Sequence, residues 1–108
     1  MEDEISNVFN VWVQNLNKPR KLTKRRIKAI QDALKIVSEK EIILVIEYIF
    51  NSDDEYASFI RGNNKAETKY TGLLNLLRIK KIEDKVKRAK LWKSSFELPE
   101  DDFGWEIK

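Results

Sequence analysis

Residues 70–89, YTGLLNLLRIKKIEDKVKRA, constrain the fold most, because they join a short apolar turn to a basic amphipathic segment. In the basic part, Ile82, Val86 and Ala89 are spaced by four and three residues, which places them on one side of a helix. A short helix is only marginally stable alone in water, so this stripe must pack against helices formed earlier in the chain. The opposite side is expected to expose the cations, namely Lys80, Lys81, Lys85, Lys87, Arg88, Lys90 and Lys93.

Two earlier segments show the same apolar spacing. A first helix is expected over residues 3–16, with a stripe formed by Ile5, Val8, Phe9, Trp12 and Leu16. Pro19 disfavours helix at the residue before it, so this helix should end there. A second helix is expected after Thr23, a plausible N-cap, and should reach about Val37. Its core-facing stripe is Ile27, Ile30, Leu34 and Val37.

Two capping patterns follow in the middle of the chain. Ser38 and Glu41 form a capping box before an apolar run that reaches Phe50. The β-branched residues of this run favour a strand, whereas the capping box favours a buried helix, which we expect. A second box at residues 52–55 predicts a short helix that ends at Gly62. Three adjacent acids there also fit a metal or acid/base site, but helix capping explains them more simply.

A polar loop, residues 61–69, precedes Thr71, which is the cap candidate for the leucine-rich turn. Such a loop is often only a connection, but its backbone N–H groups and its cations also fit a phosphate. The fold class expected is all-α, a compact bundle of about five helices in residues 1–95. A non-helical acidic-aromatic tail, residues 96–108, should follow it.

Composition removes several functional classes. The chain has no cysteine and no histidine, so it lacks thiol metal ligands, disulfides and the commonest general base. No apolar stretch is long enough to span a membrane, and the acidic start does not resemble a signal peptide. With no phosphate loop or nucleophile motif, we expect no enzyme, catalytic residue, metal or cofactor, although a carboxylate-only metal nuclease is an alternative. The expected location is the cytoplasm of a host cell.

Charge divides the chain into a basic body and an acidic tail. Residues 1–95 contain 20 lysines and arginines against 13 acids, and residues 18–28 contain seven cations and no acid. Cations at a helix start oppose the helix dipole, so helix stability does not explain their presence. They form either a solvated surface or an anion-binding surface. The candidate nucleic-acid-binding residues are Lys18, Arg20, Lys21, Lys24, Arg25, Lys28, Arg61, Lys65, Arg78, Lys81, Lys85 and Arg88.

The tail alternates acids with large apolar residues. It either folds back over an apolar groove or basic patch, or docks on a partner protein, with acids steering and aromatics anchoring. The candidate partner-binding residues are Phe96, Asp101, Asp102, Phe103 and Trp105.

Tyr70, Leu73, the run Asn75-Leu76-Leu77-Arg78, Lys81-Ile82 and Val86 resemble the C-terminal domain of phage replication proteins, the replisome organisers and initiation proteins. The upstream positions that fit are Trp12, Leu22, Thr23, Arg26, Ile30, Leu34, Ser38, Glu41 and Ile46. The resemblance spans about residues 5–90 and implies phage or prophage origin and a link to DNA replication. Family members usually carry a separate N-terminal DNA-binding domain, whereas this chain begins directly at the first expected helix.

Two functions are compatible with these patterns. The first is a non-enzymatic replication accessory protein that binds DNA with weak sequence specificity and a replication protein through its tail. The second is an interaction module that inhibits or redirects a host enzyme, such as a replicative helicase, without binding DNA. Neither involves a membrane.

Overall fold

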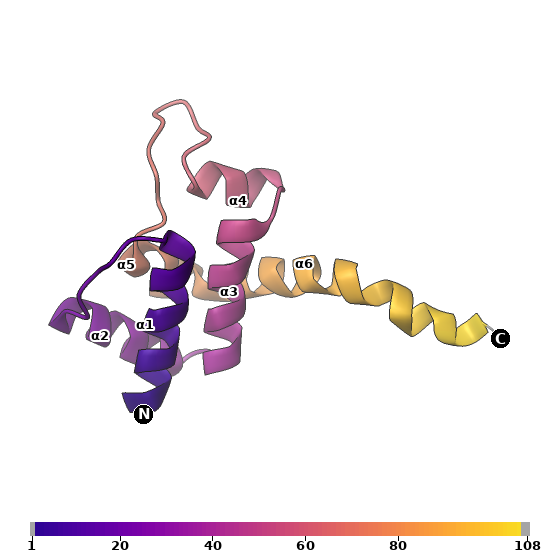
Figure 1. Cartoon of the computed structure of the whole chain (residues 1–108), viewed down its shortest axis with the longest axis horizontal. Helices are drawn as coiled ribbons and strands as arrows, with labels where there is room; N and C mark the ends of the chain where they lie inside the picture. Colours follow the sequence, from indigo (N-terminus) through magenta and orange to yellow (C-terminus); the bar gives the residue numbers. More distant parts are fainter. Residues whose placement is uncertain (1, 107–108) are drawn as a thin grey trace.

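A computed structural model describes the backbone of residues 2–106 and the side chains of residues 3–95. Within that part the chain is all-α, as predicted, and forms six helices without a strand (Figure 1). They are α1 (Glu2–Leu16), α2 (Lys24–Leu34), α3 (Glu39–Asn51), α4 (Glu55–Ile60), α5 (Leu73–Leu76) and α6 (Ile79–Glu106). No helix there is both long and apolar enough to cross a membrane.

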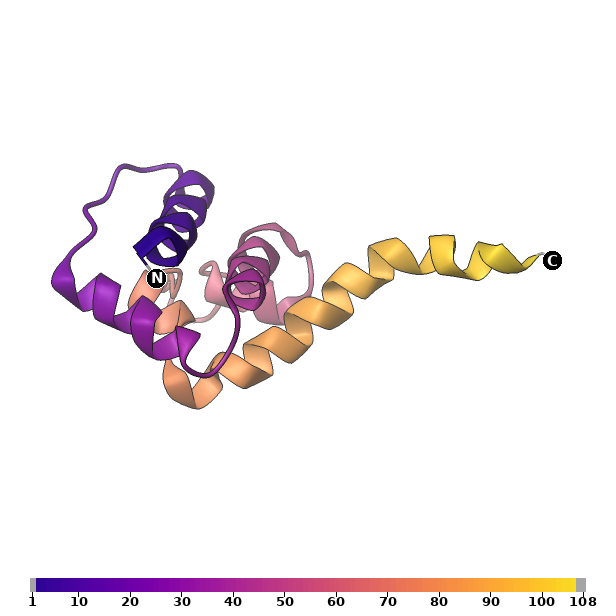
Figure 2. The ribbon, with the colours of Figure 1, turned by 90° about the horizontal axis from the view of Figure 1, so that it is seen from below.

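The central element is α3, which packs beside α1 and across α6 (Figures 1 and 2). The predicted capping box is present: Ser38 Oγ accepts from the Glu41 N–H, and Glu41 accepts from the Ser38 N–H. The apolar run is therefore a helix and not a strand. Ile42, Val45 and Ile49 are fully buried, in agreement with a helix that is covered on more than one side.

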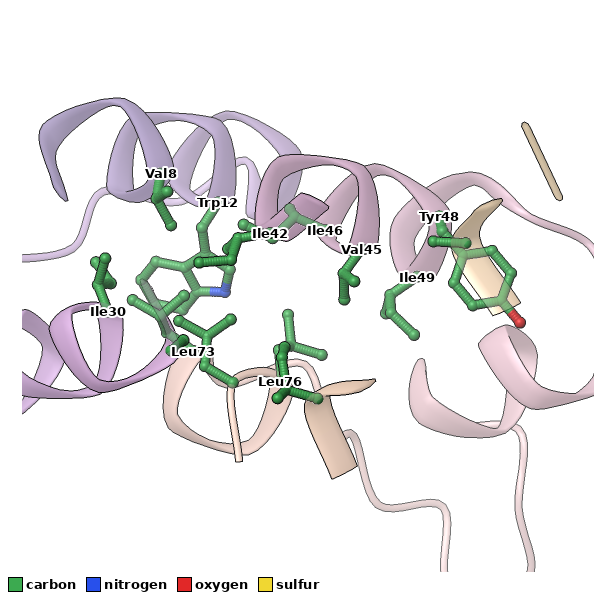
Figure 3. Packing of buried hydrophobic residues seen from close by; sticks show 14 of the residues in the cluster. Val8, Trp12, Ile30, Ile42, Val45, Ile46, Tyr48, Ile49, Leu73 and Leu76 are labelled. Atoms are coloured by element: carbon green, nitrogen blue, oxygen red, sulfur yellow. The ribbon is translucent and has the colours of Figure 1, made fainter. Parts of the chain in front are cut away.

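The core is assembled around Trp12, which lies between α1 and the segment that precedes α5 (Figure 3). Its ring is 2% exposed, and its Nε1–H donates to the Thr71 carbonyl at 2.9 Å. Thr71 was predicted as a cap, but Gly72 is the N-cap of α5 and makes no side-chain hydrogen bond. Thr71 therefore connects the leucine-rich turn to α1, and does not start a helix.

The short helix α4 begins later than predicted. Its N-cap is Asp54, whose carboxylate accepts from the Ala57 N–H at 2.8 Å and from the Tyr48 hydroxyl at 2.7 Å. Ser52 instead ends α3, and its hydroxyl accepts from the Asp54 N–H at 3.2 Å. Serine and aspartate both cap helices well, so only the hydrogen bond from Tyr48 identifies Asp54 as the cap. Gly62 follows α4 with a φ of 117°, as a C-terminal glycine should.

We expect acid to weaken the junction of α3 and α4. Burial acts to raise the pKa of Asp54, but hydrogen bonds from Ala57 and Tyr48 outweigh it and hold the pKa below its ordinary value. Such a carboxylate stabilises the fold above its unfolded pKa of about 3.9, and this contribution is lost as the pH falls through the folded pKa. In urea titrations from about pH 7 to about pH 2, wild type and Asp54→Asn should therefore converge in free energy of unfolding. A difference that stays constant over this range would contradict the assignment.

The last helix, α6, buries the predicted stripe of Ile82, Val86 and Ala89. Its bounds run past Ser95, but the segment after Ser95 has no described side chains, so the predicted non-helical tail stays a prediction. The same holds for the partner-binding residues predicted there: Phe96, Asp101, Asp102, Phe103 and Trp105.

Candidate nucleic-acid interface

The start of α2 presents the densest group of exposed cations in the described part of the chain. Thr23 is the N-cap, as predicted, and its hydroxyl accepts from the Arg26 N–H at 3.2 Å. Lys24 and Arg25 occupy the first turn, which contains no acidic residue, and both are exposed. The exposed residues Lys18, Arg20 and Lys21 precede them in the connection from α1. A phosphate here would meet free helix N–H groups as well as cations.

Arg26 fixes this group of cations to the core. Its guanidinium lies 5.0 Å from the centre of the Trp12 ring and donates to the Lys21 carbonyl at 2.6 Å. The first contact joins α2 to α1, and the second holds the connection against the helix start. Sequence reasoning counted Arg26 among the cations but did not find this role, because nothing in the sequence spacing relates Arg26 to Trp12.

A shallow depression of about 360 Å³ connects the start of α2 with α5. It is lined by Thr23, Arg25, Arg26 and the half-exposed Leu74. Arg78 follows Leu74 by four residues, directly before α6, and α2 contacts both α5 and α6. The depression thus joins the start of α2 to α5, and α5 is followed by the turn that leads into α6. Arg78 and Lys81 are exposed there.

Lys85 corrects the prediction of an exposed basic side on α6, because it is only 3% exposed. Its position lies three residues after Ile82 and four before Ala89, so it belongs to the buried side of the helix. The predicted stripe was too narrow, since α6 packs against both α3 and α2.

Two predicted DNA-contacting arginines are occupied by contacts within the protein. The Arg61 guanidinium donates to the Ile49 and Ser52 carbonyls, each at 2.7 Å, and thereby satisfies the end of α3. Arg88 pairs with Asp84 at 3.0 Å and lies 4.1 Å from the centre of the Tyr56 ring. These contacts give both residues a structural role.

The remaining predicted residues lie at the margin of the surface or away from it. Lys28 forms an exposed ion pair with Asp32 at 3.2 Å. Lys65 is exposed in the loop between α4 and α5, which rises away from α2 (Figure 1). The structure therefore joins the cations of α2 to α5 through a shared depression, but it does not bring Lys65 to them.

No cluster of three or more acids that suits a metal ion exists among the described residues. None of the known protein-family models, curated proteins or solved structures matches this chain.

Proposed function

We propose that this protein is a non-enzymatic accessory factor of phage or prophage DNA replication that binds DNA through the starts of α2 and α6. The supporting observation is the depression that Arg25 and Arg26 share with Leu74 of α5, the helix that leads into α6. The sequence resemblance to phage replication proteins supports the link to replication. A surface of lysines and arginines recognises phosphates and not base edges, so sequence specificity is weak.

The proposal is tested with paired charge variants in a salt-titrated DNA-binding assay. Lys24→Gln with Arg25→Gln should weaken binding to duplex DNA about tenfold and reduce the slope of log K against log salt by about 2. Both residues are exposed, so the fold should be unchanged. The control is Lys40→Gln with Lys87→Gln, which removes the same charge from exposed positions outside the proposed surface.

An equal loss of affinity in both variants would mean that only net charge matters. Absence of binding by the wild type at low salt, with and without residues 96–108, would reject the DNA proposal.

A second candidate function is an interaction module that inhibits or redirects a host enzyme such as a replicative helicase, without DNA. A different depression between α3 and α6 favours it, because half-buried Ile43 and Leu44 line it together with Lys40, Glu47 and Lys93. A pull-down with purified replicative helicase tests it, using wild type, Leu44→Asp and a Phe103→Ala/Trp105→Ala variant. Equal recovery by all three would exclude both the depression and the tail as docking sites.

A further inference from the structure

Lys85 is a buried cation without a partner in the described part of the chain. It is 3% exposed, and no described carboxylate or carbonyl pairs with its ammonium group. The neighbouring Asp84 pairs with Arg88 instead. Burial of an unpaired ammonium costs several kcal/mol, so a fold that retains one needs a reason beyond packing.

The side chain of Lys85 is directed toward the start of α6. Side chains of an α-helix lean toward its N-terminus, and Lys85 follows Lys81 by four residues and Arg78 by seven. All three therefore lie on one side of the helix. Burial first, and then the nearby charge of Arg78, lowers the pKa of Lys85; Asp84 acts in the opposite direction, and Lys81 adds a smaller lowering effect. Lys85 is thus close enough to both Arg78 and Lys81 to be repelled by them.

The helix start adds donors to this cluster. The first turn of the 28-residue α6 contains no acid, so the positive end of its dipole faces no carboxylate there. The Lys81 N–H already donates to the Arg78 carbonyl at 3.0 Å, so the leading N–H groups open to a ligand are those of Ile79 and Lys80. Arg78 is oriented from the preceding turn, since its Nη2 donates to Asn75 Oδ1 at 3.4 Å. Asn75 is itself fixed by donating to the Tyr70 carbonyl at 2.8 Å.

We propose that the start of α6 is a binding site for one phosphate group, held by Arg78, Lys81 and Lys85 together with the leading N–H groups of the helix. A phosphate supplies both the negative charge and the hydrogen-bond acceptors that Lys85 lacks among residues 3–95. The planar guanidinium of Arg78 suits two phosphate oxygens, and the ammonium of Lys85 approaches from the protein side.

The group can belong to a nucleic-acid backbone or to free phosphate. A nucleic-acid source rests on the proposed function. In that case the site holds the DNA backbone at one phosphate.

The test uses the full chain with three probes: inorganic phosphate, a single-stranded oligothymidylate and a DNA duplex. The variant is Lys85→Met, which keeps an unbranched side chain of nearly the same length and removes its charge. The control is Lys87→Met, which removes a charge from an exposed position of the same helix outside the proposed surface. Binding is followed by backbone amide NMR shifts of residues 79–82 and by affinity.

Phosphate should shift these amides in the wild type, and Lys85→Met should weaken phosphate binding at least tenfold. Lys87→Met should change it by less than about threefold. Lys85→Met should also melt at a higher temperature than wild type, which shows that lost binding does not result from unfolding.

The outcomes separate this site from the proposed function. Dependence of both phosphate and DNA binding on Lys85 supports the site with DNA as the source. Dependence of phosphate binding alone on Lys85 supports the site with free phosphate as the source, and the Lys24/Arg25 variant then decides the DNA proposal separately. Phosphate binding without dependence on Lys85, no phosphate-induced shift, or an equal loss in Lys87→Met would overturn the site.

Discussion

Replacement of Trp12 by alanine is expected to lower the free energy of unfolding by about 3–5 kcal/mol, the largest effect of any single substitution considered for this chain. The ring is buried between α1 and the approach to α5, so its loss opens a cavity where three elements meet. It also removes the donor to the Thr71 carbonyl and the surface on which Arg26 rests. Urea denaturation followed by far-ultraviolet circular dichroism measures the loss without depending on tryptophan fluorescence.

Trp12→Phe is the matched control. It keeps an aromatic ring but leaves the Thr71 carbonyl without its donor, and we expect a loss of about 1–3 kcal/mol. A Trp12→Ala variant within about 1 kcal/mol of wild type would show that Trp12 does not organise the core.

Arg61→Ala is expected to cost about 2–3 kcal/mol of unfolding free energy, because Arg61 was predicted to contact DNA but serves the fold. Its guanidinium satisfies the carbonyls of Ile49 and Ser52 at the end of α3, and Ser52 is buried. Without Arg61 both acceptors lose a charged donor. Thermal and urea denaturation measure the effect.

Arg61→Lys keeps the charge but not the forked donor, so it should recover only part of the stability. The DNA affinity of the folded fraction should be unchanged in both variants. A lower DNA affinity with an unchanged free energy of unfolding would show that Arg61 contacts DNA as first predicted.

Much of the helical arrangement could be predicted from periodicity and caps. The stripe at Ile82, Val86 and Ala89 is buried, the Ser38–Glu41 capping box is present, and Thr23 caps α2. These features depend on residues close together in the sequence, where helix geometry alone determines their relation. The cap at Asp54 was predicted two residues early because Ser and Asp cap helices equally well, and only the hydrogen bond from Tyr48 identifies Asp54 as the cap.

The candidate site was harder to predict, because it depends on contacts between distant segments. Lys85 reads as a solvated lysine in a basic helix until α3 and α2 cover that side. Arg61 and Arg88 read as free cations until the end of α3 and the Tyr56 ring occupy them. Charge composition thus predicted a class of ligand, whereas packing decides which cations remain exposed.

The four-residue helix α5 sets the spacing between the two cationic helix starts. It lies against α2 on one side and leads directly into Arg78 on the other, and its Leu73 and Leu76 are buried. The separation between two bound phosphates would therefore be determined by uncharged leucines. A substitution that repacks these leucines would alter how the spacing of the two helix starts matches the spacing of DNA phosphates, without changing any charge. DNA affinity would then depend on the packing of the hydrophobic interior.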